Sequence, residues 1–129
     1  MQSVGLYIHV PFCKRKCVYC DFFSAALQTK QTETSRTDDY VSAVIRNIKA
    51  AGRKYDTVYF GGGTPSLLEA RQIADIISAA NILYGAEISM ECNPDSADLG
   101  YLCDIRSAGV NRISFGVQSL NNGELAALG

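Results

Sequence analysis

Three cysteines lie within eight residues near the start of the sequence, in the segment CKRKCVYC at positions 13–20. Their spacing is Cys-x₃-Cys-x₂-Cys, which brings three thiolates into one short loop. A cubane iron–sulfur cluster usually takes four thiolates, and a structural zinc ion also closes its shell with four ligands. Three ligands leave one metal position open, as catalytic metals do for a substrate or cofactor. We therefore expect Cys13, Cys17 and Cys20 to bind a metal centre with an open position.

The charge around these cysteines suits a thiolate-bound cluster. Lys14, Arg15 and Lys16 lie between the first two cysteines, where they would partly offset its negative charge. A structural zinc site is the alternative, with His9, the one histidine of the sequence, as the fourth ligand. We favour the cluster because the sequence offers no second pair of zinc ligands.

The two remaining cysteines have a different setting. Cys92 and Cys103 lie in periodic segments, and we expect both to be buried as small apolar side chains. The count of five cysteines is odd and no export signal precedes them, which favours a reducing compartment over a disulfide framework. We therefore expect a cytoplasmic protein.

The bulk composition is that of one ordinary globular domain. The 129 residues are 47% hydrophobic and 19% charged, with a net charge of −1. The cations are scattered, so we expect no nucleic-acid partner and no anionic membrane partner. No apolar run approaches the ~20 residues of a transmembrane helix.

Strands and helices alternate four times along the predicted chain. The expected strands are residues 5–10, 57–60, 87–93 and 112–119, rich in β-branched or aromatic side chains. The expected helices are residues 38–51, residues 66–82, a third that ends at Gly109 and a fourth that begins at Asn121. Residues 24–37 are polar, and we expect an exposed loop there. Strand–helix repeats of this kind predict an α/β fold with an all-parallel sheet.

Polar residues at the expected helix starts predict the caps. We expect Thr37 to cap the first helix and Ser66 to form a capping box with Glu69 at the second. Asp95 or Ser96 is expected to cap the third helix.

One face of the predicted sheet is polar, although parallel strands usually read as continuous apolar runs. The polar side chains alternate with other residues along strands one, three and four: Tyr7, His9, Glu87, Ser89, Glu91, Asn93, Arg112, Ser114 and Gln118. This pattern predicts a barrel-like sheet around a polar interior, with its chemistry at the carboxyl ends of the strands. The cysteine loop, GGGTP, ECNP and GVQS all lie at those ends. An open, flavodoxin-like half-domain whose polar face meets solvent is the alternative.

The segment LYIHVPFCKRKCVYCDF resembles the opening of the radical S-adenosylmethionine (SAM) superfamily. More narrowly, it is similar to the branch that contains oxygen-independent coproporphyrinogen III oxidases and the related radical SAM heme chaperones. Three further motifs follow in order: VYFGGGTPSLL at 58–68, ISMECNPD at 88–95 and NRISFGVQSLNNGELAALG at 111–129. The resemblance covers essentially the whole chain.

This resemblance implies a radical SAM (β/α) barrel, of which these four βα units would be the N-terminal part of the core domain. A closed barrel has more units. We therefore expect residues 1–129 to be a fragment, with the rest of the barrel and a C-terminal domain outside this sequence. If 129 residues is the natural length, a homodimer that closes the barrel is the alternative.

The resemblance also implies the cofactors. In this superfamily three cysteines, here matched by Cys13, Cys17 and Cys20, hold a [4Fe–4S] cluster. The amino and carboxylate groups of SAM chelate the fourth iron, which would account for the open position. The cluster passes one electron to SAM, and a 5′-deoxyadenosyl radical forms.

Seven residues match positions that contact SAM in the family: Tyr7, Tyr19, Gly62, Gly63, Thr64, Glu91 and Gln118. The resemblance implies that Tyr19 lies near the adenine and that GGGTP lines the methionyl group. For GGGTP the alternative is a plain strand-to-helix turn. For Glu91 the alternative is an internal ion pair with Arg112.

One departure separates the two branches of the family. The oxidases typically show a fourth cysteine two residues after the third, and here that residue is Phe22. This favours a heme chaperone, which would bind heme and deliver it to a recipient hemoprotein. The first alternative is oxidative decarboxylation of coproporphyrinogen III to protoporphyrinogen IX, with the porphyrinogen as substrate. The second alternative is a structural zinc-binding module.

Overall fold

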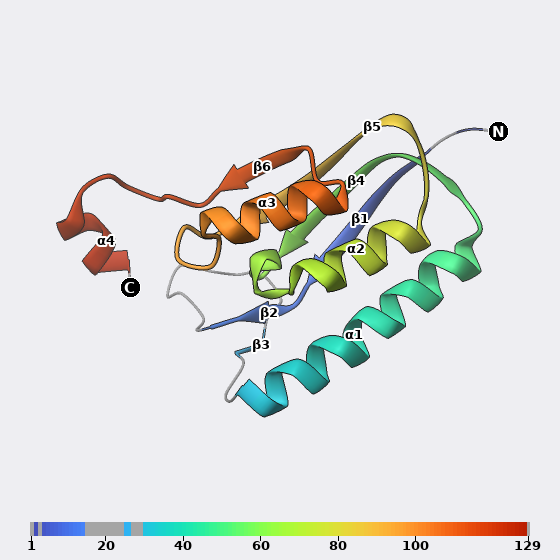
Figure 1. Cartoon of the computed structure of the whole chain (residues 1–129). Helices are drawn as coiled ribbons and strands as arrows, with labels where there is room; N and C mark the ends of the chain where they lie inside the picture. The colour runs from blue at the N-terminus through green and yellow to red at the C-terminus, as the bar shows by residue number, and fades with distance from the viewer. Residues whose placement is uncertain (1, 3, 15–24, 27–29, 129) are drawn as a thin grey trace.

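The computed structural model describes residues 2, 4–14, 25–26 and 30–128, and its centre is a four-stranded parallel sheet. The strands are β1 (Val4–Val10), β4 (Lys54–Gly62), β5 (Asn81–Cys92) and β6 (Arg112–Phe115), hydrogen-bonded in the order β1-β4-β5-β6 (Figure 1). A second, two-stranded sheet pairs β2 (Phe12–Cys13) in parallel with β3 (Ala25–Ala26). The predicted α/β fold with a parallel sheet is confirmed.

Helices cover one face of the sheet. They are α1 (Lys30–Ala51), α2 (Ala70–Ala79) and α3 (Leu99–Ala108), which lie side by side in front of the strands in Figure 1. A short 3₁₀ helix, η1 (Pro65–Leu67), leads into α2. The last helix, α4 (Asn122–Leu128), lies apart from this layer. Among the described helices, none combines the length and hydropathy that crossing a bilayer requires.

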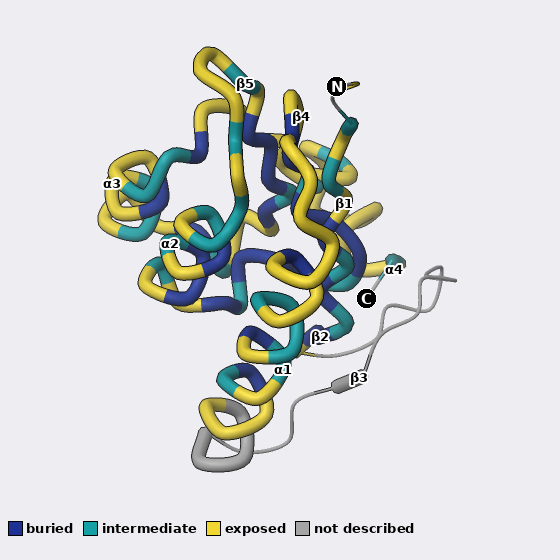
Figure 2. Tube along the Cα trace, turned by 90° about the vertical axis from the view of Figure 1, so that its right-hand side faces the viewer, coloured by how far each residue is buried: buried dark blue, intermediate teal, exposed yellow. Residues whose placement is uncertain are grey.

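The core lies between the sheet and these helices (Figure 2). Alternate strand residues point into it, including Ile8, Val10, Val58, Phe60, Ile88 and Met90. The helices contribute Val41, Ile48, Ile73, Ile76 and Ile105. Burying one such side chain stabilises the fold by about 1.5–3 kcal/mol. Because strand side chains alternate between faces, the polar residues of the same strands lie on the side away from the helices.

The start of α1 differs from the prediction. Residues 30–37 are helical rather than part of an exposed loop, so α1 begins eight residues before Asp38. Thr37 is not a cap: it is buried inside the helix, where its hydroxyl donates to the Thr34 carbonyl at 3.1 Å. Tertiary contacts hold these added turns, since the Arg36 guanidinium lies 6.0 Å from the centre of the Phe12 ring.

The start of α2 also differs. The N-cap is Glu69 rather than Ser66, and its partner in the capping box is Gln72, whose Oε1 accepts from the Glu69 amide at 2.9 Å. Pro65 begins the 3₁₀ turn that carries Ser66 away from the α2 start. The Ser66 hydroxyl instead accepts from the Asn93 amide at 3.2 Å.

Four further boundaries correct the prediction. The cap of α3 is Asp98, which accepts from the Tyr101 amide at 2.8 Å, rather than Asp95 or Ser96. Strand β5 begins at Asn81 rather than at residue 87, and α2 ends at Ala79. Strand β6 ends at Phe115 because β5, its only described neighbour, itself ends at Cys92.

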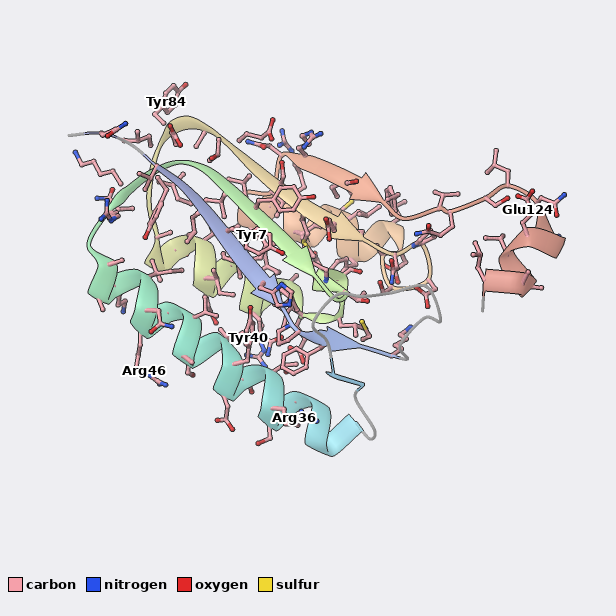
Figure 3. The ribbon with its side chains drawn as sticks, turned by 180° about the vertical axis from the view of Figure 1, so that it is seen from behind. Tyr7, Arg36, Tyr40, Arg46, Tyr84 and Glu124 are labelled. Carbon is pink, nitrogen blue, oxygen red and sulfur yellow. The ribbon has the colours of Figure 1, made fainter. Side chains whose placement is uncertain are left out.

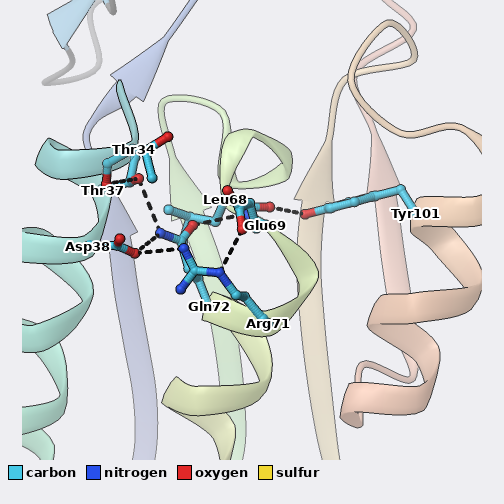
Figure 4. Close-up of polar contacts among 8 residues, drawn as sticks. All are labelled: Thr34, Thr37, Asp38, Leu68, Glu69, Arg71, Gln72 and Tyr101. Atoms are coloured by element: carbon cyan, nitrogen blue, oxygen red, sulfur yellow. Dashed lines mark hydrogen bonds and ion pairs between the residues drawn. The ribbon is translucent and has the colours of Figure 1, made fainter. Parts of the chain in front are cut away.

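A polar seam joins α1 to α2, with one further contact from α3 (Figure 4). The buried Gln72 amide donates to Thr37 Oγ1 at 3.1 Å and to Asp38 Oδ1 at 2.7 Å. Arg71 donates to Asp38 at 3.0 Å on the exposed side of the seam. The Tyr101 hydroxyl reaches from α3 to the Leu68 carbonyl at 2.8 Å. These contacts fix the helices that support the carboxyl ends of the strands.

Candidate functional site

The GGGTP segment packs directly against the first cysteine. Backbone hydrogen bonds run from the Gly63 amide to the Val10 carbonyl and from the Thr64 amide to the Phe12 carbonyl, both at 2.7 Å. A Cβ atom added to Gly63 would lie 2.5 Å from the Phe12 carbonyl oxygen and 3.0 Å from Cys13 Sγ. A side chain at residue 63 would therefore force the two segments apart, so the glycine is required by this close approach.

Cys13 is buried at the centre of these contacts, with 8% of its surface exposed. The Thr64 hydroxyl donates to Cys13 Sγ at 3.6 Å, and the Asn93 side-chain amide donates to the Thr64 hydroxyl at 3.2 Å. Three motifs that lie far apart in the sequence are therefore linked through Thr64, which bonds to both Cys13 and Asn93. A hydroxyl aimed at sulfur suits a thiolate, which can only accept a hydrogen bond.

The other two predicted cluster ligands, Cys17 and Cys20, lie outside the described residues, as do Tyr19 and Phe22. Within the described part, no three His, Cys, Asp or Glu side chains gather as a metal site. The three-cysteine site and its zinc alternative therefore both stay predictions. The pairing of Cys13 with Ala26 joins the two ends of the segment that carries the other cysteines.

The polar face of the sheet carries a chain of aromatic and carboxylate groups. The Tyr7 ring stacks on Tyr59, with centroids 6.0 Å apart and planes 19° from parallel. The Tyr59 hydroxyl donates to Glu91 Oε1 at 2.7 Å. Gly61 leaves room for the stack, since a Cβ there would lie 2.9 Å from Tyr59 and 3.0 Å from Tyr7. Figure 3 shows Tyr7 on the side of the sheet away from α2 and α3.

Both phenols on this face are held in the protonated form. The hydrogen bond to Glu91 is the largest cause of the raised pKa of Tyr59. Desolvation, followed by the charge of Glu91, raises the pKa of Tyr7. Tyr59 therefore remains a donor to Glu91 at neutral pH, while 58% of the Tyr7 surface stays exposed to the polar side.

The alternative pairing of Glu91 with Arg112 is wrong. Arg112 forms its ion pair with Glu87, at 3.5 Å, and donates to the Ser89 hydroxyl at 3.4 Å. Glu91 is instead fixed by Tyr59. The Arg112–Glu87 pair is more than half exposed on both sides, so it contributes little to stability.

Gly62 and His9 occupy the same strand end. Gly62 has a φ of 108°, which favours glycine, and a Cβ there would lie 2.7 Å from His9 Nδ1. The Tyr7 hydroxyl lies 3.2 Å from the same nitrogen, and the Tyr40 hydroxyl donates to the His9 carbonyl. The His9 ring thus lies beside Tyr7 and Gly62, whereas Tyr40 of α1 holds the His9 backbone.

Gln118 lies just beyond β6. Its φ of 66° is left-handed, which is uncommon for a residue other than glycine and turns the chain at this point. A Cβ on Gly116 would lie 3.0 Å from Gln118 Nε2 and 3.4 Å from Asn93 Oδ1, so the Gln118 amide lies near the end of β5.

Two residues of this site were given no role from the sequence. Tyr59 could have been found from its place two residues before Gly61 on the polar face of β4, in register with Tyr7. Asn93 was placed on the polar face, but its contact with Thr64 depends on the turn after β4.

The two remaining described cysteines, Cys92 and Cys103, differ in their exposure to solvent. Cys92 is buried, as predicted, and burial raises the pKa of its thiol to about 11, so it remains a thiol at neutral pH. The expected burial of Cys103 is wrong: it lies on the exposed side of α3, whereas Ile105 faces the core.

Comparison with known proteins gives consistent results. The family model described as the radical SAM superfamily matches residues 7–128. The chain is 39% identical to the heme chaperone HemW of Escherichia coli (strain K12), covering 100% of this chain and 35% of that protein. It is 35% identical to the mitochondrial radical S-adenosyl methionine domain-containing protein 1 of Bos taurus, covering 99% of this chain and 30% of that protein. The chain thus spans about a third of the length of these curated relatives.

A solved structure is also similar. The coproporphyrinogen III oxidase HemN of Escherichia coli, described as a radical SAM enzyme, superposes with a TM-score of 0.84 at 29% identity. The match covers 98% of this chain and 30% of that one.

Proposed function

Because the chain belongs to the radical SAM superfamily, we propose that Cys13, Cys17 and Cys20 hold a [4Fe–4S] cluster with SAM at its open position. SAM and such a cluster are the cofactors that this superfamily generally uses, and the predicted resemblance and partial-barrel fold are confirmed. The surroundings of Cys13 support the proposal, since a buried sulfur that accepts a hydrogen bond suits a ligand thiolate. One-electron reduction of SAM is the chemistry that the cluster supplies when both are bound.

We propose that the SAM site lies along the carboxyl ends of β1, β4 and β5. The residues that would line it are Tyr7, Tyr19, Gly62, Gly63, Thr64, Glu91 and Gln118. Tyr59 would orient Glu91, because its hydroxyl donates to one carboxylate oxygen. A carboxylate can accept further hydrogen bonds, from ribose hydroxyls or an ammonium group. The exposed Tyr7 ring offers an apolar surface beside it.

We propose that the whole protein binds heme and delivers it to a hemoprotein. The observation that carries this is the 39% identity to the heme chaperone HemW over the full chain. Phe22, at the position where the oxidases have a cysteine, supports the same choice. Oxidation of coproporphyrinogen III is the second candidate, favoured by the superposition on the oxidase HemN.

One experiment separates these two functions. Anaerobically reconstituted full-length protein is given heme and, separately, coproporphyrinogen III with SAM and a reductant. We expect stoichiometric heme binding and transfer to an apo-hemoprotein, without protoporphyrinogen IX. Turnover to protoporphyrinogen IX would replace the delivery function with the oxidase function. Heme binding without transfer would also contradict the proposal.

A further inference from the structure

The Cys13 sulfur receives a directed hydrogen bond from the GGGTP segment. Thr64 is buried, with 5% of its surface exposed, and its hydroxyl lies 3.6 Å from Cys13 Sγ. In the proposed SAM site, the carbonyls of GGGTP would accept from the SAM ammonium. The Thr64 hydroxyl is therefore available to the cysteine.

Asn93 fixes the direction of this hydroxyl. Its Nδ2 donates to Thr64 Oγ1 at 3.2 Å, which occupies an acceptor site of the oxygen. A hydroxyl carries a single proton. With its oxygen already accepting from Asn93, the Thr64 hydroxyl presents that proton to Cys13 Sγ.

Asn93 is itself held by its backbone. Its amide donates to the Ser66 hydroxyl at 3.2 Å, and its carbonyl accepts from the Ser96 amide at 3.1 Å and the Ser96 hydroxyl at 3.2 Å. The two serine hydroxyls also bond to each other. The turn after β5 is thereby tied to the turn after β4, which fixes the backbone that carries the donor to Thr64.

From this geometry we propose that Thr64, oriented by Asn93, raises the reduction potential of the cluster through its hydrogen bond to the Cys13 sulfur. The inference rests on the proposed cluster at Cys13. Hydrogen bonds to cluster sulfurs are among the factors that set cluster potentials. Reduction adds negative charge to the cluster and its ligands, so a donor stabilises the reduced form more than the oxidised form. Thr64 and Asn93 are positioning residues in this role.

The test measures the midpoint potential of the reconstituted full-length protein by EPR-monitored redox titration, without SAM. Thr64→Val keeps the shape of the side chain but removes the donor, and we expect a shift to lower potential. Thr64→Ser restores a hydroxyl, and we expect a potential close to that of the wild type. Thr57→Val is the matched control: it makes the same change on the exposed part of β4, and its potential should be unchanged.

A second variant tests the relay through Asn93. The carboxylate of Asn93→Asp would accept the Thr64 proton, so the hydroxyl would turn away from Cys13. We expect a lower potential, part of which comes from the added charge alone. Introducing Asn93→Asp into the Thr64→Val background measures that part, and the shift there should be smaller. If Thr64→Val fails to load a cluster, the shift caused by Asn93→Asp is compared between the wild-type background and a Thr64→Ala background instead.

The outcomes separate this inference from the proposed function. Wild-type protein that takes up no four-iron cluster overturns both. A cluster whose potential is the same in wild type and Thr64→Val overturns the hydrogen-bond role alone. Equal shifts from Thr64→Val and Thr64→Ser, or an Asn93→Asp shift of equal size in both backgrounds, also overturn it.

Discussion

At the scale of single residues, the described site is organised around Gly63 and Cys13. The sequence predicted both as cofactor residues. The structure gives a more direct reason for a glycine at residue 63, because the atoms that a Cβ there would meet belong to the protein itself. Such a close approach could not be read from the sequence, because residues 13 and 63 meet only through the β1–β4 pairing.

We therefore expect Gly63→Ala to impair cluster loading as well as SAM binding. The added Cβ would push GGGTP away from Phe12 and Cys13, and overpacking of this kind typically costs about 1–3 kcal/mol. Iron and sulfide content after anaerobic reconstitution measures the first effect. Gly100→Ala in α3 is the control, since its Cβ would be 3.5 Å from the nearest such atom. A Gly63→Ala protein with full iron content and normal SAM affinity would contradict this placement.

The cysteines give a second prediction at this scale. Cys13→Ser, Cys17→Ser and Cys20→Ser should each lose the cluster, because three thiolates are its complete protein ligand set in the proposal. Cys92→Ala and Cys103→Ser should keep it, since one is a buried thiol and the other lies exposed on α3. Iron counting and EPR provide the measurement. Stoichiometric zinc in the purified wild type would support the structural-zinc alternative instead.

At the scale of elements, the order of strands and helices was predictable, but several ends were not. Period-two alternation identified the strands, and Gly109, with a φ of 121°, ends α3 as expected. The first two turns of α1 were missed because their sequence, KQTETSRT, lacks an apolar stripe. Contacts with other elements decide that start, such as the burial of Thr37 beneath Gln72. Local sequence cannot report these contacts.

The seam between α1 and α2 makes Gln72 important for stability. Its side chain is 1% exposed and bonds to Thr37, Asp38 and the Glu69 amide. We expect Gln72→Met, which keeps the size of the side chain, to lower the free energy of unfolding by about 1–3 kcal/mol, because the buried Thr37 hydroxyl and the more exposed Asp38 carboxylate and Glu69 amide lose their bonds to Gln72. Urea unfolding measures this. Arg71→Ala should change it by no more than about 1 kcal/mol, because its ion pairs are exposed.

The same seam predicts a pH dependence. The hydrogen bond from Gln72 is the largest cause of the lowered pKa of Asp38; desolvation opposes it, and Arg71 adds to it. A carboxyl with a lowered folded-state pKa contributes stability above its unfolded pKa of about 3.9 and loses that contribution as the pH falls. The stability difference between wild type and Asp38→Asn should therefore be constant near neutral pH and narrow below about pH 4. A difference that stays constant down to pH 2 would show that the carboxylate charge has no such role.

At the scale of the whole molecule, two features of the sheet were predicted. Its polar face was predicted from polar side chains that alternate along the strands, and its parallel order from the alternation of strands and helices along the chain. Several apolar side chains near the end of the described chain are exposed: Phe115 and Val117 are 44% and 43% exposed, and Leu120 is 95% exposed.

We expect a protein of residues 1–129 to self-associate in sedimentation experiments. Phe115→Lys together with Leu120→Lys should reduce that association, because the charges interrupt the apolar surface. Leu99→Lys, a change at a 78% exposed position on α3, is the control and should have less effect. A monomer with a sharp unfolding transition and strong SAM binding would show that these residues form a self-sufficient unit.

The hydrogen bond between Thr64 and Cys13 also has a consequence for the time course of synthesis. The donor follows the sulfur by 51 residues in the chain. At translation rates of about 5–20 residues per second, the ribosome needs roughly 3–10 s to add that stretch. During this interval the nascent cysteine segment lacks both its hydroxyl donor and the GGGTP backbone that packs against it. Iron delivered for the proposed cluster before β4 has emerged would meet an unformed site, so we expect that cluster to be loaded late in synthesis or after release.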